Sequence, residues 1–157
     1  MKNRQKMYQT TSLILIIDQL VKIIINHTME IHQEIKVIPN LFSLYYVKNT
    51  GAAFSILENN TTLLIIITVI FIIILNRLII KEKNLTKLTS LSLGLVMGGM
   101  FGNLIDRIIY HGVIDYFSIM FFKYRFPIFN IADIGITMGV ILLCIDTYLQ
   151  EKKQKLS

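Results

Sequence analysis

The residues best suited to chemistry are two aspartates, Asp115 and Asp133, each close to the end of a long apolar block. A short aromatic segment separates them, so a chain folded across a membrane would bring both to the same face. Two carboxylates in a poorly hydrated pocket do not both ionise; one holds a proton while the other stays charged. Such a pair can activate a water molecule and protonate a leaving amine, as aspartic proteases do. The alternative interpretation is two unrelated polar anchors near the membrane interface.

Four apolar blocks must position these acids. The chain has 157 residues, of which 54% are hydrophobic and 17% are charged; average domains have about 45–50% and about 25%. A bilayer core needs roughly 20 apolar residues as helix, and blocks of that kind lie at about 8–25, 61–80, 88–109 and 128–149. We therefore expect an α-helical integral membrane protein with four transmembrane helices. It forms one membrane domain over residues 1–157, with outer segments at about 26–60 and 110–127.

The basic residues predict the orientation of these helices. Most of the 16 Lys and Arg residues lie in the N-terminal tail, between the second and third blocks, and in the C-terminal tail. Because cytoplasmic segments carry the excess of Lys and Arg, both termini should face the cytoplasm. The net charge of +6 then reflects topology, and nucleic-acid binding is not expected. The first block has no small-residue cleavage site after it, so we expect an uncleaved anchor rather than a signal peptide.

The two outer segments have different compositions. Residues 35–38 and 42–47 are rich in β-branched and aromatic residues, with a Pro-Asn pair between them. This pattern predicts two short strands and a turn, and residues 49–51 predict a second turn. We expect a small extracytoplasmic β-sheet at the membrane surface. Residues 110–127 hold many aromatic rings, which predicts an aromatic interfacial loop.

Several charged and polar residues lie inside the apolar blocks, where a carboxylate costs at least about 2.5–3.5 kcal/mol. Asp18 and Lys22 are four residues apart and share a helix face. One interpretation is an ion pair that compensates itself and extends toward the interface; the other is that Asp18 helps to hold an outer-leaflet site. Asn103, Asp106 and Arg107 form either a structural network or the lining of an outward-facing cavity. The last two diverge by about 100° on a helix, so we expect them to reach different partners.

Glycines recur at helical spacing in the third and fourth blocks. The third block has Gly94, Gly98 and Gly102, and the fourth has Gly135 and Gly139. Small residues at this spacing let helices approach closely in lipid. We therefore predict that these glycines serve packing rather than chemistry.

Other chemistries lack the residues that they need. The three histidines do not have metalloprotease spacing, and neither a nucleophile elbow nor a phosphate-binding loop is present. The single cysteine, Cys144, has no partner for a disulfide and is expected to fill apolar space. No metal site is predicted.

Five motifs in order resemble the lipoprotein signal peptidases, also called signal peptidase II. They are DQLVK at 18–22, NTGAAFS at 49–55, GNLIDR at 102–107, GVIDYF at 112–117 and FPIFNIAD at 126–133. The resemblance covers nearly the whole chain. Tyr116 stands where this family often has Phe, and Ile134 stands where Ser is common. Neither departure removes a catalytic group.

The resemblance implies a specific reaction. This family consists of bacterial inner-membrane aspartic proteases that remove the signal peptide from diacylglyceryl-modified prolipoproteins, cutting just before the lipidated lipobox cysteine. Asp115 and Asp133 match the catalytic pair, while Asp18 and Lys22 match a structural polar motif. Five residues match the substrate pocket: Asn49, Asn103, Asp106, Arg107 and Asn130.

The resemblance also implies partners. The family acts on membrane-anchored, lipidated substrates in contact with membrane lipid, is inhibited by globomycin, and uses neither a metal nor an organic cofactor. The default expectation is a monomer, because one chain supplies every matched group. A homodimer through an exposed glycine stripe is the alternative.

Three competing interpretations remain at this point. A small transporter or channel subunit would also carry intramembrane acids, but here the polar residues gather at the outer end rather than tracing a path across the membrane. A non-enzymatic assembly factor gives no reason for a matched acid pair. A different intramembrane aspartic protease is disfavoured because Gly112 lies three residues before Asp115, not two as in a GxGD motif.

Overall fold

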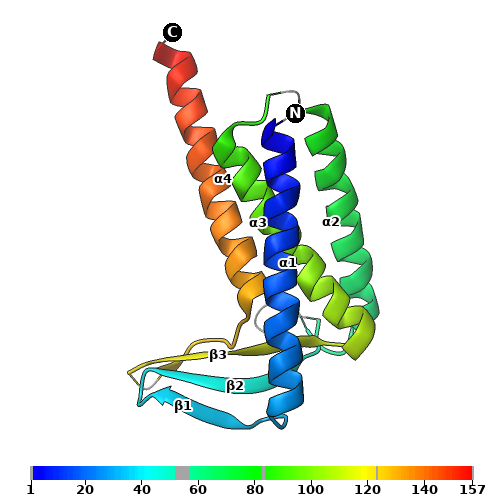
Figure 1. The fold of residues 1–157 in the computed structure, drawn as a ribbon, viewed down its shortest axis with the longest axis vertical. Coiled ribbons are helices and arrows are strands. Elements are labelled where there is room, and N and C mark those ends of the chain that lie inside the picture. Colours follow the sequence, from blue (N-terminus) through cyan, green and yellow to red (C-terminus); the bar gives the residue numbers. More distant parts are fainter. Residues whose placement is uncertain (1, 52–56, 83, 123, 157) are drawn as a thin grey trace.

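Four long helices form the body of the protein, which is described here from a computed structural model covering residues 2–51, 57–82, 84–122 and 124–156. They are α1 (Lys2–Thr28), α2 (Thr61–Lys81), α3 (Lys87–Tyr110) and α4 (Ile131–Leu156). Each is long and apolar enough to cross a membrane, which confirms the expected helical membrane architecture. Both termini lie at one end of the bundle and the sheet lies at the other (Figure 1).

Helix α3 is the central helix, because it makes extensive contacts with both α1 and α4. Its glycines face these neighbours at backbone distance. A Cβ atom on Gly98 would lie 2.9 Å from the carbonyl oxygen of Thr11 on α1, and one on Gly139 of α4 would lie 2.7 Å from that of Ser92. The prediction that the glycine stripes serve close helix packing is therefore confirmed.

The antiparallel sheet lies at the end of the bundle opposite the termini. Its order is β1-β2-β3-β4, with strands β1 (Glu34–Ile38), β2 (Phe42–Asn49), β3 (Val113–Phe121) and β4 (Tyr124–Arg125). The first two strands lie where the sequence predicts them. The segment 110–127, expected as an aromatic loop, contributes two further strands, and β3 pairs directly with β2. The sheet thus joins both outer segments into one layer.

The connection from β3 to α4 controls where α4 begins. The apolar block that starts at about residue 128 does not begin as helix. Phe129 instead pairs with Phe117 of β3, with N–H to carbonyl distances of 2.8 and 3.1 Å. This extended pairing uses backbone groups that a helix would need, so α4 starts only at Ile131. As a result, the first turn of α4 is held against β3.

Candidate active site

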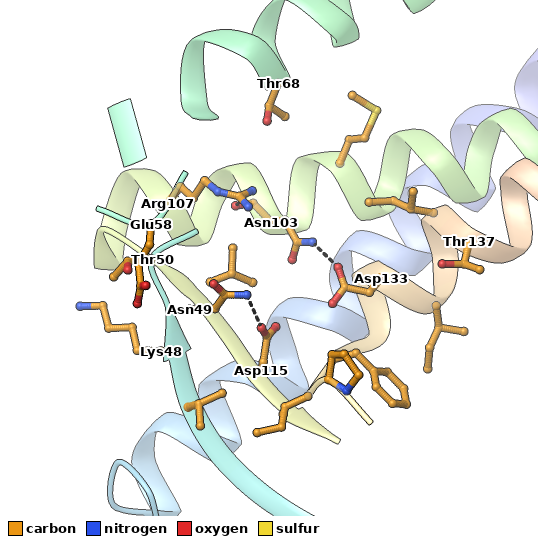
Figure 2. A pocket seen from close by; sticks show the side chains of 18 of the residues that line it. Lys48, Asn49, Thr50, Glu58, Thr68, Asn103, Arg107, Asp115, Asp133 and Thr137 are labelled. Atoms are coloured by element: carbon orange, nitrogen blue, oxygen red, sulfur yellow. Dashed lines mark hydrogen bonds between the residues drawn. The ribbon is translucent and has the colours of Figure 1, made fainter. Parts of the chain in front are cut away.

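Asp115 and Asp133 come from different elements and line the same cavity. Asp115 is the third residue of β3, and Asp133 is the third residue of α4. The pairing of Phe117 with Phe129 brings these two element starts together. Both carboxyl groups point into one cavity, which has a volume of about 910 Å³ (Figure 2). The structure therefore brings together the two acids that the sequence singled out.

The cavity has a polar wall and an apolar wall. The polar wall comes from α3, the end of β2, the start of β3 and the start of α4, and includes Asn49, Asn103 and Arg107 beside the two acids. Apolar residues of α2, of the segment 126–129 and of α4 form the other wall, and those from the two helices are Ile67, Phe71, Ile134, Ile136 and Met138. A ligand in this space would meet hydrogen-bonding groups at one side and hydrocarbon at the other.

Asn130 links the two acids, although it is fully buried and is not among the described residues that line the cavity. Its side-chain Nδ2 donates to Asp115 Oδ1 at 2.7 Å, and its backbone N–H donates to Asp133 Oδ2 at 3.2 Å. Its Oδ1 in turn accepts from the backbone N–H of Asp133 at 2.9 Å. Asn130 therefore holds both carboxyl groups from the buried side of the site, away from the cavity.

Asn103 supplies a second contact to Asp133. Its Nδ2 donates to Asp133 Oδ1 at 2.8 Å, and its own Oδ1 accepts from Asn130 Nδ2 at 3.1 Å. Asp133 thus accepts one hydrogen bond on each oxygen, from a side-chain amide and from a backbone N–H. These two donors fix the orientation of the Asp133 carboxyl group.

Asp115 is in a different environment. Its side chain is only 2% exposed. Burial, followed by the charge of Asp133, raises the pKa of Asp115 to about 7, while hydrogen bonds from Asn49 and Asn130 act in the opposite direction. Two acids in different surroundings can take different protonation states at neutral pH. The two acids therefore differ in burial and in hydrogen-bond partners.

Asn49 reaches Asp115 from the end of β2. Its Nδ2 donates to Asp115 Oδ2 at 3.1 Å, and its Oδ1 accepts from the backbone N–H of Gly51 at 2.9 Å. The second bond is an Asx-type turn, which agrees with the turn predicted at 49–51. The remaining part of this motif, 52–55, lies outside the described residues.

Arg107 places a cation at the cavity wall. Its Nη1 donates to the carbonyl oxygen of Asn103 and its Nη2 to that of Gly51, both at 3.3 Å. Its Nε is buried and meets no acceptor among the residues that the structure describes. Asp106, the preceding residue, bonds to other partners, as its position on the helix predicted.

Three charged residues form a buried cluster that is not part of the described cavity lining: Asp18, Lys22 and Asp106. The Lys22 ammonium is 2.8 Å from a carboxylate oxygen of each acid, and all three side chains are at most 1% exposed. The expected ion pair between Asp18 and Lys22 is confirmed. The expectation that it compensates itself and extends toward the interface is wrong, because Asp106 shares the cation and all three side chains are buried. Asp106, expected in the substrate pocket, is not among the described residues that line it.

Some cavity residues were not singled out from the sequence. Lys48 and Glu58 line the cavity near the sheet, and Thr68 and Thr137 add hydroxyls from α2 and α4 (Figure 2). Thr68 could have been noticed in the sequence, because it is the only polar residue between positions 63 and 75. Lys48 and Glu58 carry no such signal, since charged residues are ordinary in segments outside the membrane.

No group of three or more His, Cys, Asp or Glu side chains in the described part of the chain could hold a metal ion. The side chains that line the site supply two carboxyl groups with amide and guanidinium donors.

Known proteins resemble this chain over most of its length. A family model described as signal peptidase (SPase) II matches residues 10–149. A lipoprotein signal peptidase of Geobacter metallireducens is 37% identical over 92% of this chain and 91% of its own length. One from Symbiobacterium thermophilum is 39% identical over 88% of this chain and 91% of its own length.

Solved structures show the same fold. One bacterial membrane enzyme has a TM-score of 0.86 and 36% identity, and the match covers 95% of this chain and 90% of that one. A second bacterial membrane enzyme has a TM-score of 0.81 and 37% identity, with coverage of 90% and 91%. This multi-pass membrane protein belongs to the signal peptidase II family of aspartic proteases.

Proposed function

We propose that this protein removes the signal peptide from diacylglyceryl-modified prolipoproteins, cutting just before the lipidated cysteine, with Asp115 and Asp133 as the catalytic pair. The family supports the removal of lipoprotein signal peptides. The observation that carries the proposal further is the placement of two differently bonded carboxyl groups on one cavity that has both a polar and an apolar wall.

The proposed reaction is a direct attack by water. Asp133, ionised and bonded by two N–H donors, takes a proton from a water molecule, which attacks the carbonyl carbon of the scissile bond. Asp115 gives its proton to the carbonyl oxygen. The tetrahedral intermediate then collapses: the C–N bond breaks and the nitrogen takes the proton held by Asp133. Asp115 recovers its proton from the intermediate, so the pair returns to its starting state without an acyl-enzyme.

The polar neighbours have distinct roles in this proposal. Arg107 and Asn49 lie on the cavity wall, where they can hold the substrate backbone, and Arg107 can stabilise negative charge that develops on the carbonyl oxygen. Asn103 contacts Asp133 directly. Asn130 and Asp106 are assigned to support the acids from behind, because neither is among the described residues that line the cavity.

The substrate is anchored twice, by its signal helix and by its diacylglyceryl group. Anchoring converts a slow encounter into a positioned reaction. Apolar side chains of α2 and α4 give the cavity a wall suited to these hydrocarbon groups. The polar side of the cavity lies near the sheet, where a scissile bond just outside the signal helix would be held.

We assign the protein to the bacterial inner membrane as a single membrane domain, with both termini cytoplasmic and the catalytic pair at the outer face. The support is the concentration of Lys and Arg at the end of the bundle that carries the termini, opposite the sheet (Figure 1). We propose that it works as a monomer, without a cofactor, and that globomycin inhibits it.

The test is cleavage of a purified prolipoprotein by the detergent-solubilised protein. The substrate is supplied with and without diacylglyceryl on its cysteine, and mass spectrometry identifies the new N-terminus. We expect cleavage of the lipidated form alone, a product that begins with the modified cysteine, and inhibition by globomycin. Equal cleavage of both forms, or a cut at another bond, contradicts the proposed substrate.

A further inference from the structure

Lys22 is a buried cation that does not contact the acid pair itself but binds residues that contact Asp115, Asp133 or the backbone beside them. Its ammonium is 2.8 Å from Asp18 Oδ2 and 2.8 Å from Asp106 Oδ2, and it donates to Asn103 Oδ1 at 2.9 Å. An ammonium group has three N–H donors. These three contacts therefore use its full capacity, at a position that is 1% exposed.

Each carboxylate partner of Lys22 holds the backbone beside one catalytic acid. Asp18 Oδ1 accepts from the N–H of Ala132 at 2.9 Å, and Ala132 directly precedes Asp133. Asp106 Oδ2 accepts from the N–H of Ile114 at 3.0 Å, and Ile114 directly precedes Asp115. One cation thus pairs with both carboxylates that bind the backbone at the start of α4 and at the start of β3.

The third contact sets the orientation of Asn103. Its side-chain oxygen faces two donors, Lys22 Nζ at 2.9 Å and Asn130 Nδ2 at 3.1 Å. The NH₂ group must then face the other way, toward Asp133 Oδ1 at 2.8 Å. An amide turned by 180° would present its oxygen to the carboxylate of Asp133 and its NH₂ to two donors. Lys22 therefore favours the orientation that supports Asp133.

We propose that Lys22 is a positioning residue for catalysis, which acts on Asp133 through Asn103 and on the spacing of the two acids through Asp18 and Asp106. This inference rests on the proposed function, because it assigns a role toward the same acid pair. A role limited to stabilising the fold would predict that substitution of Lys22 lowers thermal stability and leaves the turnover of folded enzyme intact.

The substitution must not leave two buried charges without a counter-ion, since breaking a buried pair is strongly destabilising. We therefore compare Asp106→Asn with the double variant Lys22→Met/Asp106→Asn. The amide at position 106 keeps an oxygen for Ile114. Relative to Asp106→Asn, the double variant loses one cation and leaves Asp18 as a single buried carboxylate. The comparison of kcat is therefore made on protein whose midpoint of thermal unfolding shows that it is folded.

The expected result is a fall in kcat of at least about tenfold between these two variants, with KM changed by less than about threefold. The matched control is Asp146→Asn, which removes a buried carboxylate that accepts from Thr86, Thr89 and Gln150 at the opposite end of the bundle. It should lower the midpoint of thermal unfolding without lowering kcat. Equal kcat in the two Lys22 variants would overturn the proposal.

A double-mutant cycle tests whether Lys22 acts through Asn103. In the Asp106→Asn background, Lys22→Met is introduced with Asn103 present and with Asn103→Ala. If the amide transmits the effect, the cost of losing Lys22 should be clearly smaller once Asn103 is absent. Fully additive losses in kcat contradict this route.

A readout independent of activity separates this inference from the proposed function. The side-chain amide signals of Asn103 in ¹⁵N-labelled protein are assigned by their loss in Asn103→Ala. Lys22→Met in the Asp106→Asn background should shift them, and Asp146→Asn should not. Unchanged Asn103 signals overturn the inference even if the wild type cleaves its substrate. If the wild type is inactive but the signals shift, the proposed function fails while the contact to Asn103 stands.

Discussion

Asn130 donates its side-chain amide to Asp115 at 2.7 Å, and the same residue meets Asp133 through its backbone. One residue therefore bonds to both members of the acid pair. Asn130 can do so because the extended pairing of Phe129 with Phe117 ends immediately before it and α4 begins immediately after it. The junction between a strand-like segment and a helix thus sets the relative position of the two carboxyl groups.

We predict that Asn130→Ala lowers kcat/KM by about ten- to a hundredfold. The substitution removes the donor to Asp115 Oδ1 and the acceptor of the Asp133 N–H, and a buried polar group left without its partner costs about 1–3 kcal/mol. The measurement is the rate of cleavage of the lipidated prolipoprotein. The matched control is Asn26→Ala, which removes a side-chain amide that accepts from Tyr46 away from the cavity. A similar loss of activity in both variants would show that the effect is not specific to the acid pair.

The raised pKa of Asp115 predicts the alkaline limb of the activity profile. Asp115 must carry a proton to act as the acid, and that proton is lost as the pH rises through about 7. We expect kcat/KM to fall by about tenfold per pH unit above this limb. The measured limb reports the pair rather than one residue. A rate that stays constant up to pH 9 contradicts the assignment of Asp115 as the acid.

Removing the Asn49 side chain tests the same alkaline limb, because it should move the limb to higher pH. Its hydrogen bond lowers the pKa of Asp115, so Asn49→Ala should raise that pKa and move the alkaline limb to higher pH. The control is Ser43→Ala on the same strand, which removes a hydroxyl that donates to Glu34. It should leave the limb in place. A shift of the limb to lower pH in Asn49→Ala would contradict the role of this contact.

The packing of α3 against α4 predicts a graded effect of added methyl groups. A Cβ at position 139 would lie 2.7 Å from the carbonyl oxygen of Ser92, whereas at position 135 the nearest atom, the carbonyl oxygen of Leu95, is 3.2 Å away. Gly139→Ala should therefore lower the midpoint of thermal unfolding more than Gly135→Ala. Equal midpoints would contradict the packing described for this interface.

The four membrane-spanning helices could be predicted from the sequence because membrane spans have a strong compositional signal. Residues 61–81 contain few polar side chains, and their length matches a bilayer. The first two strands were also predictable from their β-branched residues and the intervening turn. Strand β3 could not be predicted from the sequence, because its aromatic residues are equally typical of a loop at the membrane interface.

The candidate site could be predicted only in part. Asp115 and Asp133 stood out because carboxylates are expensive near apolar blocks. The position of Asp106 behind the cavity depends on which face of α3 meets Lys22, and spacing along one helix does not determine this. The role of Asn130 depends on a backbone pairing between Phe117 and Phe129, which has no local sequence signal.

The central claim is that Asp115 and Asp133 both act in catalysis, and the most direct measurement is kcat for Asp115→Asn and Asp133→Asn on the diacylglyceryl-modified prolipoprotein. Each substitution keeps the shape of the side chain but removes its ability to exchange a proton. We predict that each lowers kcat by at least about a hundredfold, while the midpoint of thermal unfolding shows that the variants are folded. If either folded variant keeps more than about a tenth of the wild-type kcat, the acid pair is not the catalytic centre.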